Sequence, residues 1–251
     1  MQTFIPTPYK FLSPREQARD YALKYIIPFV FGHGPDPDNY AFNSGTATLV
    51  DLGSGPLALT CEHVATPFRE FREANKDKIN AQLYIGGATG IDRKVIDWDK
   101  GLDIATLQLT EDELNKIPFS QNACGIQCIN EIYTGPITED DVIVFAGFPS
   151  EPSWRYRNPN KLFSFHSCAC FAEIVSINDD YIICQSNFIT YESDTDPSIT
   201  LTTDPTGMSG GAAFLIRKKG MSISYHFIGI ISSGKFLTHN CLTLYIVGNL
   251  A

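Results

Sequence analysis

The chain has 251 residues, of which 43% are hydrophobic and 19% are charged. These proportions exclude a disordered protein and a coiled coil, and the length suffices for one large all-β domain or two small ones packed together. The formal net charge of −9 excludes the basic surface that binding to nucleic acid or to an anionic membrane requires.

A helix is predicted near the N-terminus. Ser13 can cap it, Pro14 suits its first position, and Glu16 completes a capping box. We expect this helix to continue to Lys24, to stop before Pro28, and to be followed by extended chain over residues 25–32.

Beyond this point the sequence predicts many short strands. Runs of β-branched and aromatic residues alternate with Gly, Pro and Asn-Asp turns, which favours a barrel or a sandwich. The predicted strands are residues 47–50, 56–60, 81–85, 104–109, 141–145, 170–177, 181–185, 212–216, 224–231 and 242–247. Two further helices are predicted, one over residues 67–77 and one that opens with the capping box of residues 110–113.

The cysteines and the N-terminal sequence indicate a cytoplasmic protein. No apolar run follows a basic start, and no stretch is long and apolar enough to span a bilayer. An odd number of cysteines in a chain of this size is not typical of a secreted disulfide scaffold, so we expect reduced thiols. The pairs Cys124 with Cys128 and Cys168 with Cys170 leave a zinc site as the alternative. They lack the four-ligand spacing of a zinc ribbon, and we expect no metal. The cysteines are Cys61, Cys124, Cys128, Cys168, Cys170, Cys184 and Cys241.

Three local patterns carry the side chains that nucleophilic catalysis uses. His63 follows the predicted strand 56–60, Asp103 precedes the strand 104–109, and Ser209 stands between glycines before the strand 212–216. Each has an ordinary interpretation alone: a hydrogen-bonded histidine at a strand end, a turn aspartate, and a Gly-Ser turn. Together they supply a hydroxyl nucleophile, a base that takes its proton, and an anion that orients the base. The order His, Asp, Ser is that of the chymotrypsin fold, not that of subtilisin or the α/β-hydrolases.

The chain resembles the trypsin-like (chymotrypsin-fold) serine peptidases, particularly their bacterial HtrA-like or V8-like branches. The resemblance extends from about Asn43 to Val247. The segments that carry it are Thr60-Cys61-Glu62-His63-Val64, Asp103-Ile104-Ala105-Thr106-Leu107, Ala146-Gly147-Phe148-Pro149, Gly207-Met208-Ser209-Gly210-Gly211 and Gly229-Ile230-Ile231-Ser232-Ser233-Gly234.

The resemblance implies an all-β fold of two antiparallel six-stranded β-barrels of chymotrypsin type, with the triad at their junction. We expect residues 1–40 to form a helical extension with a lead-in strand and residues 41–115 to form the first barrel, with His63 and Asp103. Residues 116–135 would connect it to the second barrel, residues 136–251, which carries Ser209.

The resemblance also assigns roles around the triad. The backbone N–H groups of Gly207 and Ser209 would form the oxyanion hole, and residues Ser232, Ser233 and Gly234 would pair with the substrate backbone. Thr203 lies six residues before the serine, where members with a basic preference carry an aspartate. Asp204 and His239 are alternative residues for the specificity pocket.

These observations predict a serine endopeptidase that acts on a protein or peptide without a cofactor. The predicted site holds no metal, and the chain binds neither nucleic acid nor membrane. A second hypothesis is a latent or inactive protease-fold binding module, because the zymogen-type N-terminus is missing and an activating protein partner could reshape the oxyanion hole. An esterase with the same triad is a third hypothesis, but Ser209 leads into a strand, whereas a nucleophile elbow leads into a helix.

Overall fold

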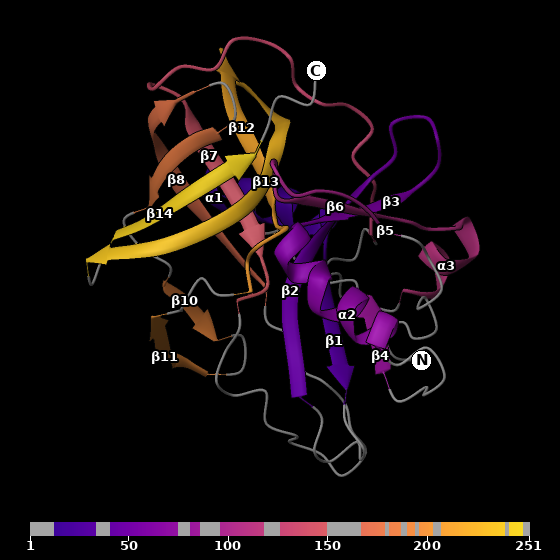
Figure 1. The fold of residues 1–251 in the computed structure, drawn as a ribbon. Helices are drawn as coiled ribbons and strands as arrows, with labels where there is room; N and C mark the ends of the chain where they lie inside the picture. Colours follow the sequence, from indigo (N-terminus) through magenta and orange to yellow (C-terminus); the bar gives the residue numbers. More distant parts are fainter. Residues whose placement is uncertain are drawn as a thin grey trace, which may run out of the picture.

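The computed structural model describes residues 13–33, 41–74, 81–85, 96–117, 126–149, 167–178, 181–186, 190–193, 196–202, 207–238 and 241–247. Two antiparallel sheets dominate this part of the chain, and short helices flank them (Figure 1). Every strand predicted from the sequence is present, and the expected all-β, two-part architecture is confirmed. Among the described residues, no helix has the length and apolar character needed to cross a membrane.

The first sheet has six strands in the order β4-β1-β2-β3-β6-β5, all antiparallel to their neighbours. Among the described strands β4 and β5 form its edges, so the first of the two expected barrels is seen here as an open six-stranded sheet. The lead-in strand expected before residue 41 pairs with β2 and β4 and therefore belongs to this sheet. The strands are β1 (Ile26–His33), β2 (Ala41–Val50), β3 (Leu57–Thr60), β4 (Ala81–Ile85), β5 (Ile96–Asp99) and β6 (Ile104–Gln108).

The second sheet closes into a barrel in the order β12-β13-β14-β9-β8-β7, with β7 also paired to β12. A separate hairpin of β10 (Thr190–Ser193) and β11 (Asp196–Thr202) lies below the barrel in Figure 1. The barrel strands are β7 (Val142–Gly147), β8 (Cys168–Ile177), β9 (Tyr181–Ser186), β12 (Ala212–Lys219), β13 (Ser222–Thr238) and β14 (Cys241–Val247).

Both predicted capping boxes are formed. In α1 (Pro14–Ala22) the Glu16 amide donates to Ser13 Oγ at 3.3 Å, and the Ser13 amide donates to the Glu16 carboxylate at 2.6 Å. The same exchange between Thr110 and Glu113 opens α3 (Glu111–Lys116). A 3-10 turn, η1 (Leu23–Tyr25), ends α1, and Pro28 lies inside β1.

The helix after His63 begins earlier than the sequence predicts. We expected residues 67–77, but α2 spans Glu62–Ala74, so His63 lies in its first turn. The amides of Val64 and Ala65 both donate to the Cys61 carbonyl at 3.2 Å, which starts the helix. Pro67 lies inside it and has no N–H to donate to the His63 carbonyl one turn earlier.

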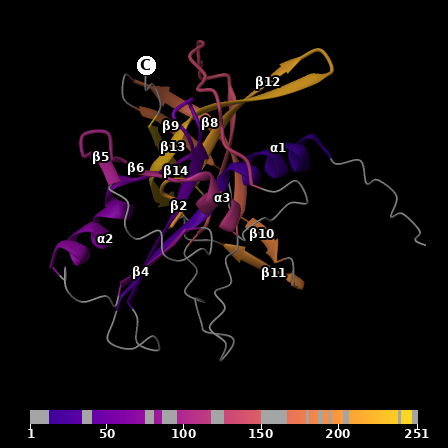
Figure 2. The same ribbon diagram turned by 90° about the vertical axis from the view of Figure 1, so that its right-hand side faces the viewer.

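The N-terminal helix packs on the second barrel and not on the sheet that follows it in sequence. The Tyr21 ring stacks on Tyr225 with centroids 4.4 Å apart and meets Phe214 edge-on at 5.3 Å. Arg15 lies over the Phe171 ring at 5.7 Å. Figure 2 shows α1 and α2 on opposite sides of the molecule. Residues 13–33 contact both halves of the fold, because α1 packs on β7, β8 and β12 while β1 pairs with β2 and β4.

Candidate active site

His63 is positioned by the start of α2. The next residue, Val64, packs directly onto Gly45 of β2, where any Cβ atom would overlap the Val64 side chain. This close approach brings the first turn of α2 down onto the sheet. The His63 side chain is 50% exposed, so its ring is accessible from solvent.

Asp103 ends the turn between β5 and β6. Its φ of 54° makes it the one non-glycine residue with a positive φ in the part of the chain that the structure describes. Asp99 Oδ1 holds the turn by accepting hydrogen bonds from the amides of Gly101 at 2.8 Å and Leu102 at 3.1 Å. A strained backbone at a charged residue is a common mark of a functional site.

The Asp103 carboxylate joins His63 and Ser232. His63 Nδ1 lies 2.8 Å from Oδ2 and 3.0 Å from Oδ1, and the His63 amide donates to Oδ1 at 3.1 Å. The Ser232 hydroxyl donates to Oδ2 at 2.8 Å. Because a carboxylate only accepts, Nδ1 carries the proton in this bond, which leaves the Nε2 lone pair on the opposite side of the ring.

Asp103 is held in its ionised form. Burial alone would raise its pKa, but hydrogen bonds from the His63 ring, the Ser232 hydroxyl and the His63 amide outweigh burial. The pKa of Asp103 is therefore below its ordinary value. At neutral pH the carboxylate can both orient the imidazole and stabilise a positive charge on it.

The Ser209 loop has a backbone that only glycines adopt readily. Gly207 and Gly210 have φ values of 92° and 87°. The Gly210 amide donates to Ile231 O at 2.7 Å, and the Gly211 amide donates to Met208 O at 2.9 Å. A Cβ atom on Gly210 would overlap Thr46 O and lie 2.5 Å from the Thr60 hydroxyl.

Strand β2 of the first sheet binds this loop across the junction. The Thr46 amide donates to Ser209 O at 2.9 Å, and the Thr46 hydroxyl donates to Gly207 O, also at 2.9 Å. The Thr48 hydroxyl donates to Gly210 O at 2.8 Å. Both threonines are fully buried. Sequence reasoning missed these two residues, because a threonine in a strand looks the same whatever its hydroxyl binds.

Three polar groups of the Ser209 loop have no hydrogen-bond partner among the described residues. Among the described residues, the N–H groups of Gly207 and Ser209 donate to no acceptor. Within the same part of the chain, the Ser209 hydroxyl makes no hydrogen bond to the His63 ring. The two N–H groups can donate to a ligand oxygen, and the hydroxyl can attack the atom that bears this oxygen.

The predicted substrate-binding residues are described in part. Ser232, Ser233 and Gly234 lie in β13, whose register against β14 shifts between Ile231 and Ser233. This irregularity accompanies the inward turn of the Ser232 hydroxyl onto Asp103, an additional role that its motif did not reveal. Thr203, Asp204 and His239 lie outside the described residues.

Cys61 lies beneath the His63–Asp103 pair as a neutral thiol. Burial, and then the charge of Asp103, raise its pKa, and its Sγ donates to Ile231 O at 3.1 Å. Its sulfur, a His63 nitrogen and an Asp103 oxygen lie within 4.8 Å of one another, so these atoms could hold a metal ion. A cation would first have to break the hydrogen bonds that these three side chains already make.

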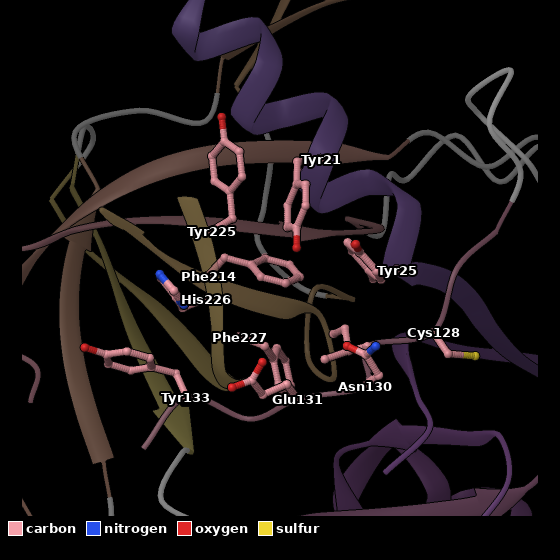
Figure 3. Close-up of a pocket in the computed structure, with 11 residues that line it drawn as sticks. Tyr21, Tyr25, Cys128, Asn130, Glu131, Tyr133, Phe214, Tyr225, His226 and Phe227 are labelled. Atoms are coloured by element: carbon pink, nitrogen blue, oxygen red, sulfur yellow. The ribbon is translucent and has the colours of Figure 1, made fainter. Parts of the chain in front are cut away.

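A pocket lies away from these residues, between α1, the connection after residue 126 and the strands β12 and β13. Its volume is about 110 Å³. Figure 3 shows Tyr21 and Tyr25 on its helix side, Phe214 and Phe227 on its strand side, and the Glu131 carboxylate near Phe227. The pocket marks where the N-terminal helix meets the barrel, and no residue of the Asp103 cluster lines it.

The profile of the trypsin-like peptidase domain matches residues 45–220. The chain belongs to this family. The match spans the first sheet from β2 onward and the second barrel through β12, including His63, Asp103 and Ser209, and it confirms the resemblance drawn from the sequence motifs. No curated protein matches the chain.

Among solved structures, the protease of tobacco vein mottling virus is similar, with 14% sequence identity and a TM-score of 0.45. That similarity covers 99% of this chain and 84% of the viral chain. A likeness this distant adds nothing to the family match. The trypsin-like peptidase family itself indicates a protease type of function, with proteins or peptides as substrates.

Proposed function

We propose that the protein is a serine endopeptidase that hydrolyses peptide bonds through an acyl-enzyme on Ser209. The observation that carries the proposal is the short bond from His63 Nδ1 to Asp103, 2.8 Å long, in the half of the fold whose strand β2 also binds the Ser209 loop. That bond leaves the imidazole Nε2 free to act as a base, and the Ser209 loop is fixed through its backbone by the same half of the fold.

In the proposed reaction, Ser209 Oγ forms a bond to the substrate carbonyl carbon and passes its proton to His63 Nε2. The carbonyl oxygen becomes negative, and the free amides of Gly207 and Ser209 donate to it. His63 then gives its proton to the amide nitrogen as the carbon–nitrogen bond breaks. A water molecule then attacks the carbonyl carbon of the ester and passes a proton to His63. His63 gives this proton to Ser209 Oγ as the ester bond breaks and the carboxylic acid product leaves. Asp103 stays ionised throughout and stabilises the imidazolium.

The proposed substrate lies along β13. Backbone groups of Ser233 and Gly234 would hydrogen-bond to the substrate as to an added strand. This pairing binds an extended peptide whatever its sequence. Thr203 is proposed to line the specificity pocket. The strand β12 follows the Ser209 loop. In an α/β-hydrolase the nucleophilic serine is followed by a helix, so this order favours a peptidase over an esterase of that fold.

The test is labelling of the purified protein by a fluorophosphonate probe, with Ser209→Ala as the comparison. Labelling of the wild type alone, together with cleavage of a peptide library by the wild type alone, is the expected result. Equal labelling of both proteins would mean that Ser209 is not the nucleophile. Labelling without any peptide cleavage would favour an esterase.

A latent protease that a protein partner activates is the second candidate. The missing hydrogen bond between Ser209 and His63 among the described residues favours it, although such bonds are often loose until substrate binds. A folded wild type that resists the probe, and becomes reactive when a partner is added, would support this candidate. The proposed cytoplasmic location is supported by the free thiols of Cys61, Cys128, Cys168, Cys170 and Cys184.

A further inference from the structure

A small polar network lies behind His63 on α2. Glu62 Oε1 accepts a hydrogen bond from Thr66 Oγ1 at 2.6 Å and from Arg69 Nη2 at 3.1 Å. The Glu62 and Arg69 side chains are only 12% and 18% exposed, so water screens their attraction weakly. The bond from Thr66, together with Arg69, lowers the pKa of Glu62 against the opposing effect of burial, so the pair stays charged in mildly acidic solution.

The network extends to the hairpin that carries Asp103. The Arg69 guanidinium lies over the Trp98 ring, with its central carbon 4.1 Å from the ring centroid. Trp98 belongs to β5 and pairs with Ala105 of β6, so it sits on the two strands whose connecting turn ends at Asp103. A guanidinium stacked this closely on an indole is held by its charge and by its flat shape.

We propose that Arg69 is a positioning residue that clamps the helix bearing His63 onto the hairpin bearing Asp103. At one end of the clamp Arg69 holds Glu62, the residue directly before His63. At the other end it holds Trp98, which lies on the Asp103 hairpin. This inference rests on the proposed function, because the clamp matters only if the orientation of His63 toward Asp103 matters.

The geometry explains why such a clamp is needed. The first turn of α2 meets the Asp103 turn through backbone bonds, from Glu62 N to Asp103 O at 3.2 Å and from His63 N to Asp103 Oδ1 at 3.1 Å. These bonds fix only the start of α2. Further along the helix, Phe68 and Phe71 pack on Phe31 of β1. Arg69, two turns along α2, contacts the Asp103 hairpin itself through Trp98.

The chain offers a matched control in the second barrel. Arg217 Nη2 pairs with Asp141 Oδ2 at 3.0 Å, again a partly buried arginine–carboxylate pair, but on the barrel surface next to Pro136. Removing Arg217 disturbs a comparable ion pair without touching α2 or the β5–β6 hairpin. A loss of stability alone would therefore appear in both variants.

The experiment compares the rate of Ser209 modification by a fluorophosphonate in wild type, Arg69→Ala, Arg69→Lys, Trp98→Ala and Arg217→Ala, with thermal unfolding of each. We expect Arg69→Ala and Trp98→Ala to slow modification by about ten- to a hundredfold, and the double variant to be no slower than either single one. Arg69→Lys, which keeps the charge but not the flat fork, should recover only part of the rate. Arg217→Ala should react like the wild type.

A second readout separates this proposal from the function on which it rests. The proton on His63 Nδ1, bonded to Asp103, should give a low-field proton resonance whether or not the serine reacts. That resonance should broaden or vanish in Arg69→Ala and persist in Arg217→Ala. If the wild type is folded but unreactive, the proposed function fails while the resonance still tests the clamp. An unchanged resonance and an unchanged rate in Arg69→Ala, or equal slowing in Arg217→Ala, would overturn the clamp.

Discussion

The two sides of the candidate site are held by different kinds of interaction. On one side, side chains converge on Asp103, with His63 and Ser232 bonded to its carboxylate. On the other side, the Ser209 loop is held through its backbone, whose carbonyls accept from Thr46 and Thr48 and whose glycines occupy positive φ. A side-chain anchor can be removed while the fold survives, whereas a backbone anchor is part of how the two halves pack. Changes on the first side should therefore alter chemistry, and changes on the second side should alter folding.

The largest expected effect is a loss of reactivity from a change on the Asp103 side of the candidate site. Asp103→Asn keeps the size of the side chain but offers an amide that stabilises the wrong histidine tautomer, so Ser209 modification should slow by about 10⁴-fold, the magnitude known for this change in serine proteases. Rates of fluorophosphonate labelling measure this loss, and the variant should remain folded at neutral pH. Asp99→Asn in the same turn retains an oxygen for the Gly101 and Leu102 amides, so it should label normally. A similar loss in Asp99→Asn would mean that turn geometry, not charge, is responsible.

The next effect is a loss of stability from a change on the Ser209 side of the candidate site. Gly210→Ala introduces a Cβ against Thr46 O at a φ of 87°, so the free energy of unfolding should fall by about 3 kcal/mol or more. Gly220→Ala is the control, since Gly220 has a φ of 63° but no atom within 4 Å of an added Cβ. It should lose only about 1 kcal/mol. Denaturant unfolding measures both, and equal losses would show that packing at the junction is irrelevant.

A third comparison lies within β2. Thr46→Val removes a hydroxyl that donates to Gly207 O and accepts from the Phe148 amide at 2.8 Å, so each of these two buried groups loses a hydrogen bond. The expected loss of unfolding free energy is about 2–4 kcal/mol, and about half of that for Thr48→Val, which removes one bond. Denaturant unfolding of the two variants side by side decides it. A smaller loss in Thr46→Val than in Thr48→Val would contradict this account.

A smaller effect is expected at Ser232. Ser232→Ala removes one of several donors to Asp103, so labelling should slow by about tenfold, equivalent to one bond to a charged group. Ser224→Ala on the same strand removes a hydroxyl bonded to His226 and should label normally. If Ser232→Ala also labelled normally, the bond between Ser232 and Asp103 would be dispensable.

The smallest effect is the pH dependence of stability. The pKa of Asp103 is lowered by folding, so its ionisation stabilises the folded state above the ordinary pKa of an aspartate, about 3.9. This contribution is lost as the pH falls through the folded pKa. The difference in unfolding free energy between wild type and Asp103→Asn should thus shrink from pH 7 to pH 3, as measured in urea. A difference that stays constant would mean that the hydrogen bonds do not depend on the charge.

Much of the fold could be predicted because local signals were unambiguous. The capping boxes at Ser13 and Thr110 marked their helices, and apolar runs marked the strands. The predicted start of α2 at residue 67 was wrong. A proline usually marks the first turn of a helix, and only tertiary contacts show that α2 begins before Pro67 and continues through it. Strands β5, β10 and β11 were missed because Ile96–Asp99 carries two aspartates and both Thr190–Ser193 and Asp196–Thr202 are largely polar.

In the candidate site, local motifs singled out His63, Asp103 and Ser209, but not what holds them. Thr46 and the Ser209 loop are adjacent only after the two halves pack, and nothing near either residue in the sequence indicates the other. The same holds for Arg69 and Trp98, which read as an ordinary surface charge and an isolated aromatic residue. Anchors that cross elements are a property of packing, so they are visible only in three dimensions.

The bonds from Thr46 to Gly207 and from Thr48 to Gly210 span 161 and 162 residues of the chain. A ribosome adds roughly 5–20 residues each second, so β2 emerges many seconds before the loop that it will hold. During that interval the histidine and the aspartate can already be paired, but the proposed nucleophile does not yet exist. The proposed activity therefore cannot appear during most of the synthesis of the chain, and it would arise only when the second barrel closes.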